Sequence, residues 1–249
     1  MNWLLLRGLS RDSRHWGEFP SILEEHLTNS KAFVMDLPGF GTERHRISPL
    51  SVKRIANDTR RRWLELKNKH GGTWSILSIS FGGMVTMDWV HRFPLDFQNA
   101  VIINTSSRDT ASPLRRLQPR GVKGFIKVGL AKTNSEREGE ILSFNCNTAP
   151  YKDPQLHDRW SKWADEQPNP ISNSIIQLQA GIRFKAPKQL PIRTLFISSQ
   201  SDRLTHPKCS WELARRYKAP LIFHDVAGHD IPLDAPDWLA DQIGRWLDT

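Results

Sequence analysis

Three residues far apart in the chain have side chains that together could perform nucleophilic catalysis. They are Ser80, Asp202 and His229, in that order along the sequence. A serine hydroxyl is a weak nucleophile that needs an adjacent base, and the base needs a third group to orient it. In such a set, His229 takes the proton of Ser80 as the hydroxyl attacks a carbonyl carbon, and Asp202 holds the imidazole in the required tautomer. The chemistry predicted is cleavage of an acyl compound through an acyl-enzyme.

The residues around Ser80 indicate how its hydroxyl would be presented. An apolar run, 74–77, precedes it, and residues 84–90 have apolar side chains at helical spacing. A strand that turns directly into a helix needs small residues two positions either side of the apex, and Ser78 and Gly82 meet that need. Backbone strain at such a corner costs about 1–3 kcal/mol and is usually kept where function uses it. We therefore expect a strained strand–serine–helix corner.

The elements that would position these residues alternate along the chain. Short apolar runs, typical of strands buried on both faces, are separated by helical patterns, which predicts an α/β fold with a mostly parallel sheet of about six strands covered by helices on both sides. Ligands bind at the carboxyl ends of such strands, and the three residues fall after such ends. The expected strands cover residues 3–6, 32–35, 74–77, 99–104, 193–198 and 220–224.

Two helices have clear boundary signals. A long helix is expected over 51–69, with Ser51 as its cap, and the last helix over 236–247, with Asp234 as its cap and a proline in its first turn.

Residues 107–190 break the alternation. They contain no clear strand but several helical pieces, so we expect a helical lid inserted after the fourth strand, with 1–106 and 191–249 as the core domain. The helical pieces cover 121–131, 136–144, 155–166 and 172–183.

Composition narrows the class of protein. The chain has 249 residues, and its two cysteines, Cys146 and Cys209, favour a reducing compartment with both thiols as packing residues. The N-terminus does not resemble a signal peptide, and no run approaches the ~20 apolar residues of a membrane span. We expect a cytoplasmic protein without a membrane span. The net charge is +9, and the predicted lid, with fourteen basic and eight acidic residues, carries +6 of it.

Four motifs in order give a resemblance to a known family. They are residues 36–41 (DLPGFG), residues 78–84 around Ser80, Asp202 with Pro207 after it, and Gly228-His229. The order serine, acid, histidine is that of α/β-hydrolases, and the chain resembles that superfamily over essentially its whole length. The lid and residues 103–106 before it are similar to the carboxylesterases that release biotin precursors from a carrier protein, or to a bacterial branch near them.

This resemblance implies further roles. The backbone N–H groups of Leu9 and Phe81 would form the oxyanion hole, and no cofactor or metal is implied. The family usually has His-Gly where this chain has Arg7-Gly8; Arg7 either braces that loop or places a cation beside the pocket that selects acidic substrates. Trp160 and Trp163, three apart on a lid helix, are either lid core or substrate contacts.

Several alternatives stay open. Asp109, after the fourth strand, is a second candidate for the acid. The substrate is a small ester or an acyl group on a carrier protein, and an acidic carrier could dock on the basic lid. The same three side chains could serve an acyltransferase or a carbon–carbon bond hydrolase, or the fold could be a catalytically silent binding module. Nucleic-acid binding is disfavoured, because the basic residues are dispersed and match no recognisable motif.

Overall fold

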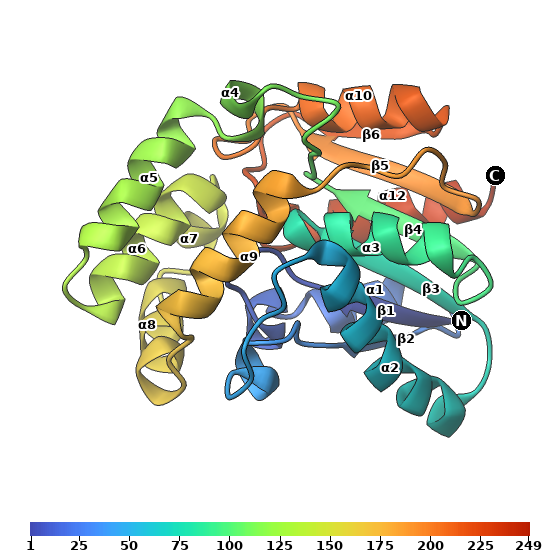
Figure 1. Cartoon of the computed structure of the whole chain (residues 1–249), viewed down its shortest axis with the longest axis horizontal. Helices are drawn as coiled ribbons and strands as arrows, with labels where there is room; N and C mark the ends of the chain where they lie inside the picture. Colours follow the sequence, from blue (N-terminus) through green and yellow to red (C-terminus); the bar gives the residue numbers. More distant parts are fainter.

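A six-stranded parallel sheet forms the centre of the computed structural model, which describes residues 1–113, 115–149 and 152–249 (Figure 1). The strand order is β2-β1-β3-β4-β5-β6, and every neighbouring pair is parallel. This confirms the predicted fold class. The strands are β1 (Asn2–Leu6), β2 (Lys31–Val34), β3 (Trp74–Ile79), β4 (Asn99–Ile103), β5 (Arg193–Ser199) and β6 (Leu221–His224).

Helices cover both faces of the sheet because the central strands are apolar on both sides. Every residue of β3 and β4 is buried, and alternate side chains of β1 enter different cores: Leu4 and Leu6 one, Trp3 and Leu5 the other. The first core is closed by α2 (Val52–His70), α3 (Phe81–Arg92) and α10 (Lys208–Tyr217), and the second by α1 (Phe19–His26) and α12 (Pro236–Leu247).

The boundary signals of the two long helices had different outcomes. Ser51 caps α2, its hydroxyl accepting from the backbone N–H of Arg54 at 3.3 Å, as predicted. The prediction that Asp234 caps the last helix is wrong. Asp234 belongs to the short helix α11 (Ile231–Asp234), and α12 begins after Ala235 without a side-chain cap.

Six helices lie between β4 and β5. The four helical pieces expected there correspond to α5 (Pro119–Leu130), α6 (Asn134–Asn145), α8 (Leu156–Glu166) and α9 (Ile171–Arg183); the short helices α4 (Pro113–Arg116) and α7 (Ala149–Lys152) were not expected. Two 3-10 turns, η1 (Ser13–Trp16) and η2 (Gly41–Glu43), lie outside this insertion, between β1 and α2. We call residues 107–190 the lid; those bounds stay a prediction from the sequence.

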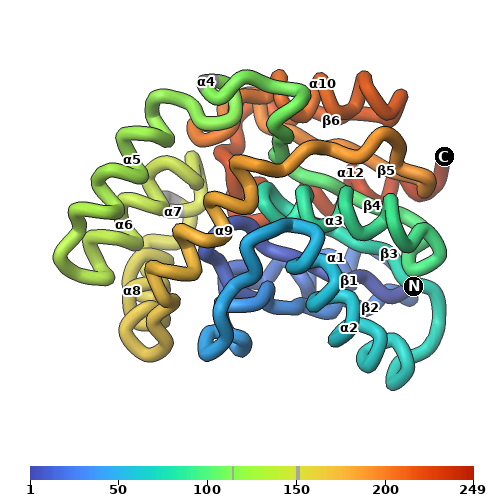
Figure 2. The backbone as a smooth tube through the Cα atoms, in the orientation of Figure 1, coloured from blue at the N-terminus to red at the C-terminus, as the bar shows by residue number. Residues whose placement is uncertain are grey.

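The lid has a small core of its own. Helices α5, α6 and α8 pack together beside the sheet, while α9 leads the chain back to β5 (Figure 2). Cys146 is buried in this small core, Cys209 is buried in α10, and both are free thiols. No helix within the described part of the chain is both long and apolar enough to cross a bilayer.

Candidate active site

Ser80 occupies the corner between β3 and α3 in the conformation that its neighbours predict. Its φ and ψ are 56° and −117°, in a region that side-chain-bearing residues rarely adopt. A Cβ added at Gly82 would lie 2.6 Å from the carbonyl oxygen of Leu6, so this position requires glycine. Ser80 is half-buried, whereas Ile79 and Phe81 are buried. The corner therefore leaves the serine as the accessible residue of a buried turn.

The imidazole of His229 is held by Asp202. The distance from His229 Nδ1 to Asp202 Oδ2 is 2.7 Å, and both side chains are buried. The other carboxylate oxygen accepts from the backbone N–H groups of Leu204 and Thr205, at 2.7 and 2.9 Å. The alternative acid, Asp109, instead pairs with Arg216 at 2.6 Å and accepts from the N–H of Ala186. The orienting carboxylate is therefore that of Asp202.

Two adjacent residues after β4 tie the serine and the histidine to the same edge of the sheet. Thr105 Oγ1 donates to the carbonyl oxygen of Ser80 at 2.8 Å, and Asn104 Nδ2 donates to that of His229 at 2.7 Å. Ser80 Oγ and His229 Nε2 make no hydrogen bond with each other, and Nε2 is buried without a partner among the described residues. In unliganded hydrolases this bond is often long and tightens when substrate binds.

The two proposed oxyanion donors lie on either side of Ser80. Phe81 is the first residue of α3, so its N–H has no intrahelical acceptor. Gly8 packs against Ser80, since a Cβ on Gly8 would lie 3.2 Å from the Ser80 Cβ, and this places the following residue, Leu9, next to the corner. Among the described residues, neither Leu9 N nor Phe81 N donates to a side chain or to a loop carbonyl. Both N–H groups are thus available to a ligand.

Comparison with known proteins agrees with the fold. The model of the alpha/beta hydrolase family matches residues 3–242. The chain belongs to the alpha/beta hydrolase family. No curated protein sequence matches it significantly.

Solved structures similar to this alpha/beta hydrolase include enzymes of several kinds. The 2-hydroxy-6-oxo-6-phenylhexa-2,4-dienoate hydrolase of Rhodococcus sp. strain RHA1 is 20% identical with a TM-score of 0.79, covering 100% of this chain and 90% of that one. The enol-lactonase of Burkholderia xenovorans LB400 is 16% identical (TM-score 0.77; 100% and 92% covered), and an esterase of Thermogutta terrifontis is 19% identical (TM-score 0.72; 100% and 89%). At these identities the likeness shows the fold alone.

The side chain of Arg7 pairs with a carboxylate of the protein itself. Its guanidinium forms a buried two-bonded ion pair with Asp230, with Nη1 3.0 Å from Oδ1, and lies over the ring of Trp16 at 4.9 Å. Asp230 neutralises this cation. The prediction that Arg7 binds substrate and selects acidic esters stays a prediction. The pair braces the loop that carries Leu9 against the loop that carries His229, which is the other role considered for this arginine.

The two lid tryptophans pack against the core rather than around Ser80. The rings of Trp160 and Trp163 lie edge-on to His15, with centroids 4.9 and 5.8 Å away. Arg11 lies over the ring of Trp160, and Arg14 over that of Trp163. Trp160 is also a buried member of the lid core. These contacts give both tryptophans a structural role at the junction of lid and core. That they also contact substrate stays a prediction.

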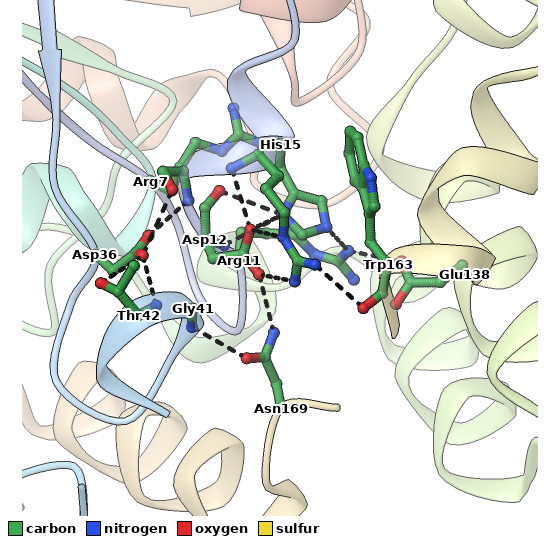
Figure 3. Close-up of polar contacts among 12 residues, drawn as sticks. Arg7, Arg11, Asp12, His15, Asp36, Gly41, Thr42, Glu138, Trp163 and Asn169 are labelled. Carbon is green, nitrogen blue, oxygen red and sulfur yellow. Dashed lines mark hydrogen bonds and ion pairs between the residues drawn. The ribbon is translucent and has the colours of Figure 1, made fainter. Parts of the chain in front are cut away.

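A buried polar network at this junction joins the loop after β1 to the lid (Figure 3). Arg11 pairs with Glu138 of α6 at 2.6 Å and also donates to His15 Nε2 at 2.8 Å. Since arginine only donates, Nε2 is the acceptor of that bond. On the other side of the ring, Nδ1 lies 3.1 Å from Asp12 Oδ1 and 3.2 Å from the backbone N of Asp12. Burial and the Arg11 charge lower the pKa of His15. His15 is therefore a neutral imidazole between two charged partners.

Asp12 is the acidic centre of the same network. Burial raises its pKa, but hydrogen bonds from His15 and Arg14 outweigh burial and hold the pKa of Asp12 well below its usual range. Asn169, in the segment before α9, donates to Asp12 and accepts from the backbone N–H of Gly41 at 3.2 Å. The loop after β1 thus contacts the lid at two places, α6 and the segment before α9.

Two positioning residues were missed as such from the sequence. Asn104 has a positive φ of 45°, and its Oδ1 accepts from Ser198 Oγ and Ser199 N at 3.1 and 2.9 Å, so it couples β5 to the histidine loop. The carboxylate of Asp234 accepts four backbone N–H groups, from Gly228 and residues 147–149. An asparagine directly after a buried strand was the available signal for the first. No local signal marked the second, because its partners come from the lid.

Proposed function

We propose that this protein is a serine hydrolase that cleaves a carboxylic ester or thioester through an acyl-enzyme formed on Ser80. The observation that carries the proposal is the 2.7 Å hydrogen bond between His229 and Asp202 at the sheet edge where Ser80 occupies a strained corner. A strained serine that is only a turn residue would not require a buried, oriented imidazole tied to the same strand end.

The proposed reaction follows from the positions of these groups. His229 Nε2 accepts the proton of Ser80 as its oxygen attacks the carbonyl carbon, and Asp202 stabilises the imidazolium. The oxyanion accepts from the N–H groups of Leu9 and Phe81, each worth about 10²–10³ in rate in comparable sites. The imidazolium then protonates the leaving alcohol or thiol, and water resolves the acyl-enzyme by the same route.

The three side chains alone do not determine the acyl acceptor or the natural substrate. A carbon–carbon bond hydrolase and an acyltransferase would use the same three side chains, so the reaction class is tested rather than read from the fold. The docking of an acidic carrier protein on the basic lid stays a prediction, as does the resemblance to carrier-protein esterases.

Labelling with a fluorophosphonate probe tests the nucleophile. We expect the wild-type protein to be labelled, Ser80→Ala to lose labelling and at least 10⁴-fold in ester hydrolysis, and Asp202→Asn to lose about 10⁴-fold in kcat with its fold intact. The matched control is Ser78→Ala, a small residue two positions away that keeps the corner. Labelling of Ser80→Ala, or no labelling of the wild type, contradicts the proposal; the latter favours the binding module.

A panel of substrates then identifies the bond cleaved. Esters and thioesters of graded chain length, and a carbon–carbon substrate of the dienoate type, are compared by kcat/KM. The proposal requires ester or thioester turnover to exceed that of the carbon–carbon substrate.

A further inference from the structure

Two lid helices present apolar side chains to solvent. Seven of the fourteen exposed large apolar side chains that the structure describes lie on α5 and α9. On each helix they are three or four positions apart, so they form a stripe along one face. We call these two stripes the lid face; it consists of Val122, Ile126 and Leu130 on α5, and Ile171, Ile175, Leu178 and Ile182 on α9.

Helix α9 faces the core with its polar and small residues. Asn173 bonds with the backbone of the loop before α2, accepting from Ser48 N at 2.9 Å, and Gln177 accepts from Ser10 N at 3.2 Å. Gly181 packs against Phe81, where a Cβ would lie 3.2 Å from the ring. The polar and small side of α9 thus contacts the core, and its larger apolar side chains are exposed to solvent, the reverse of an ordinary surface helix.

Two hydrogen bonds show which neighbouring segments lie beside α9. Arg116 Nη2 donates to the carbonyl oxygen of Gly181 at 2.6 Å, so the chain entering α5 lies against the end of α9. Asn173 also donates to the carbonyl oxygen of Arg46, which brings Ile47 and Leu50 to the first half of α9. Ile47 is 82% exposed and Leu50 55% exposed. Figure 1 shows that loop passing beside α9.

The charges on the two helices that carry the stripes are of one sign. Helices α5 and α9 contain no acidic residue, and they carry Arg120, Lys123, Lys127 and Arg183. Of these, Lys127 pairs with Glu140 of α6 at 3.0 Å. Amphipathic helices with an apolar stripe and lysine or arginine beside it bind at the surface of anionic bilayers.

We propose that the lid face docks on an anionic lipid surface, with its aliphatic side chains among the acyl chains and its cations at the headgroups. An acidic protein would match the charge equally well. However, protein interfaces are enriched in aromatic residues and depleted in lysine, whereas the stripes here consist of isoleucine, leucine and valine beside lysine. Such a surface suits a lipid bilayer better than a protein. This inference goes beyond the catalytic proposal because lipid binding does not depend on Ser80.

Vesicle flotation of the full-length Ser80→Ala protein tests this inference. We expect it to float with vesicles of phosphatidylcholine and phosphatidylglycerol, and at least tenfold less with phosphatidylcholine alone. The double variants Val122→Ser/Ile126→Ser and Ile175→Ser/Leu178→Ser should each lose at least tenfold in partitioning. The matched control is Leu95→Ser. Leu95 is 94% exposed and lies in the loop before β4, at the amino end of the strands, so its loss should change partitioning less than twofold.

The other possible occupants are outcomes of the same experiment. An acidic acyl carrier protein is added as a competitor, and sedimentation reports self-association. Failure to float with anionic vesicles overturns the inference, as does an equal loss in Leu95→Ser. Without flotation, carrier binding or dimerisation that the stripe variants abolish assigns the lid face to a protein. Ester hydrolysis by the Ser80-containing variants is measured separately, so failure of the catalytic proposal does not affect the result.

Discussion

The pair formed by Arg7 and Asp230 links two loops that carry proposed catalytic groups. One loop leads to Leu9, a proposed oxyanion donor, and the other contains His229 directly before Asp230. Both charges are buried, so each is tolerated only because the other neutralises it. The pair therefore acts on positioning, and the arginine brings no free charge to a substrate.

The variant Arg7→Met is expected to lose about 3–5 kcal/mol of stability, because Asp230 is left buried without its partner. Its kcat/KM should fall by the same factor for acidic and neutral esters, since the charge of Arg7 is already paired with Asp230. Urea unfolding and a matched pair of esters measure both effects. The double variant Arg7→Met/Asp230→Leu should regain part of the stability. A loss confined to acidic esters would restore the substrate-binding role.

Among the elements, α6 shows how a lid helix is fixed to the core. Glu138 points into the junction and pairs with Arg11 where both side chains are 8% exposed, whereas Glu140, two residues later, pairs with the exposed Lys127. Two glutamates of one helix thus form ion pairs of different burial, one with a buried arginine and one with an exposed lysine.

Burial predicts a large difference between the two glutamates. Glu138→Gln should cost about 3–5 kcal/mol, because it leaves Arg11 charged and buried, while Glu140→Gln should cost about 0–1 kcal/mol, as exposed pairs do. Thermal unfolding of both variants measures this, with limited proteolysis of the lid as a second readout. Equal effects would show that the junction does not depend on the buried pair.

At the scale of the whole molecule, acid stability depends on groups that the fold keeps uncharged. His15 lies at the junction, facing Arg11, Asp12 and the two lid tryptophans, and its pKa is lowered chiefly by burial and then by Arg11. An unfolded histidine titrates near 6.5. Below that pH the unfolded chain binds a proton that the folded His15 does not, so stability falls as pH falls, by up to about 1.4 kcal/mol per pH unit.

The variant His15→Gln should therefore show a shallower loss of stability between pH 7 and pH 5.5 than the wild type. Glutamine keeps an acceptor for Arg11 and does not titrate. His224, whose pKa burial also lowers, remains in both proteins and cancels in the comparison. Urea unfolding at a series of pH values measures the slopes, and identical slopes would contradict the assignment of the neutral state to His15.

The features that depend on local sequence pattern and on chain order could be predicted without the structure. Apolar runs predicted the parallel sheet, small residues around position 80 predicted the strained corner, and the order of Ser80, Asp202 and His229 predicted which side chains share a sheet edge. Parallel strands bring their carboxyl ends together whatever the loops do, so these inferences needed no coordinates.

Tertiary structure alone decided which charges meet. Arg7 meets Asp230, 223 residues away, and the carboxylate of Asp234 meets the lid instead of capping its own helix. The rings of the α8 tryptophans lie against His15, and α9 exposes its isoleucines to solvent. Helical spacing shows that an apolar stripe exists, but whether that stripe is buried depends on the surface that the helix packs against. In α9, hydrogen bonds to the core hold the polar side of the helix inward.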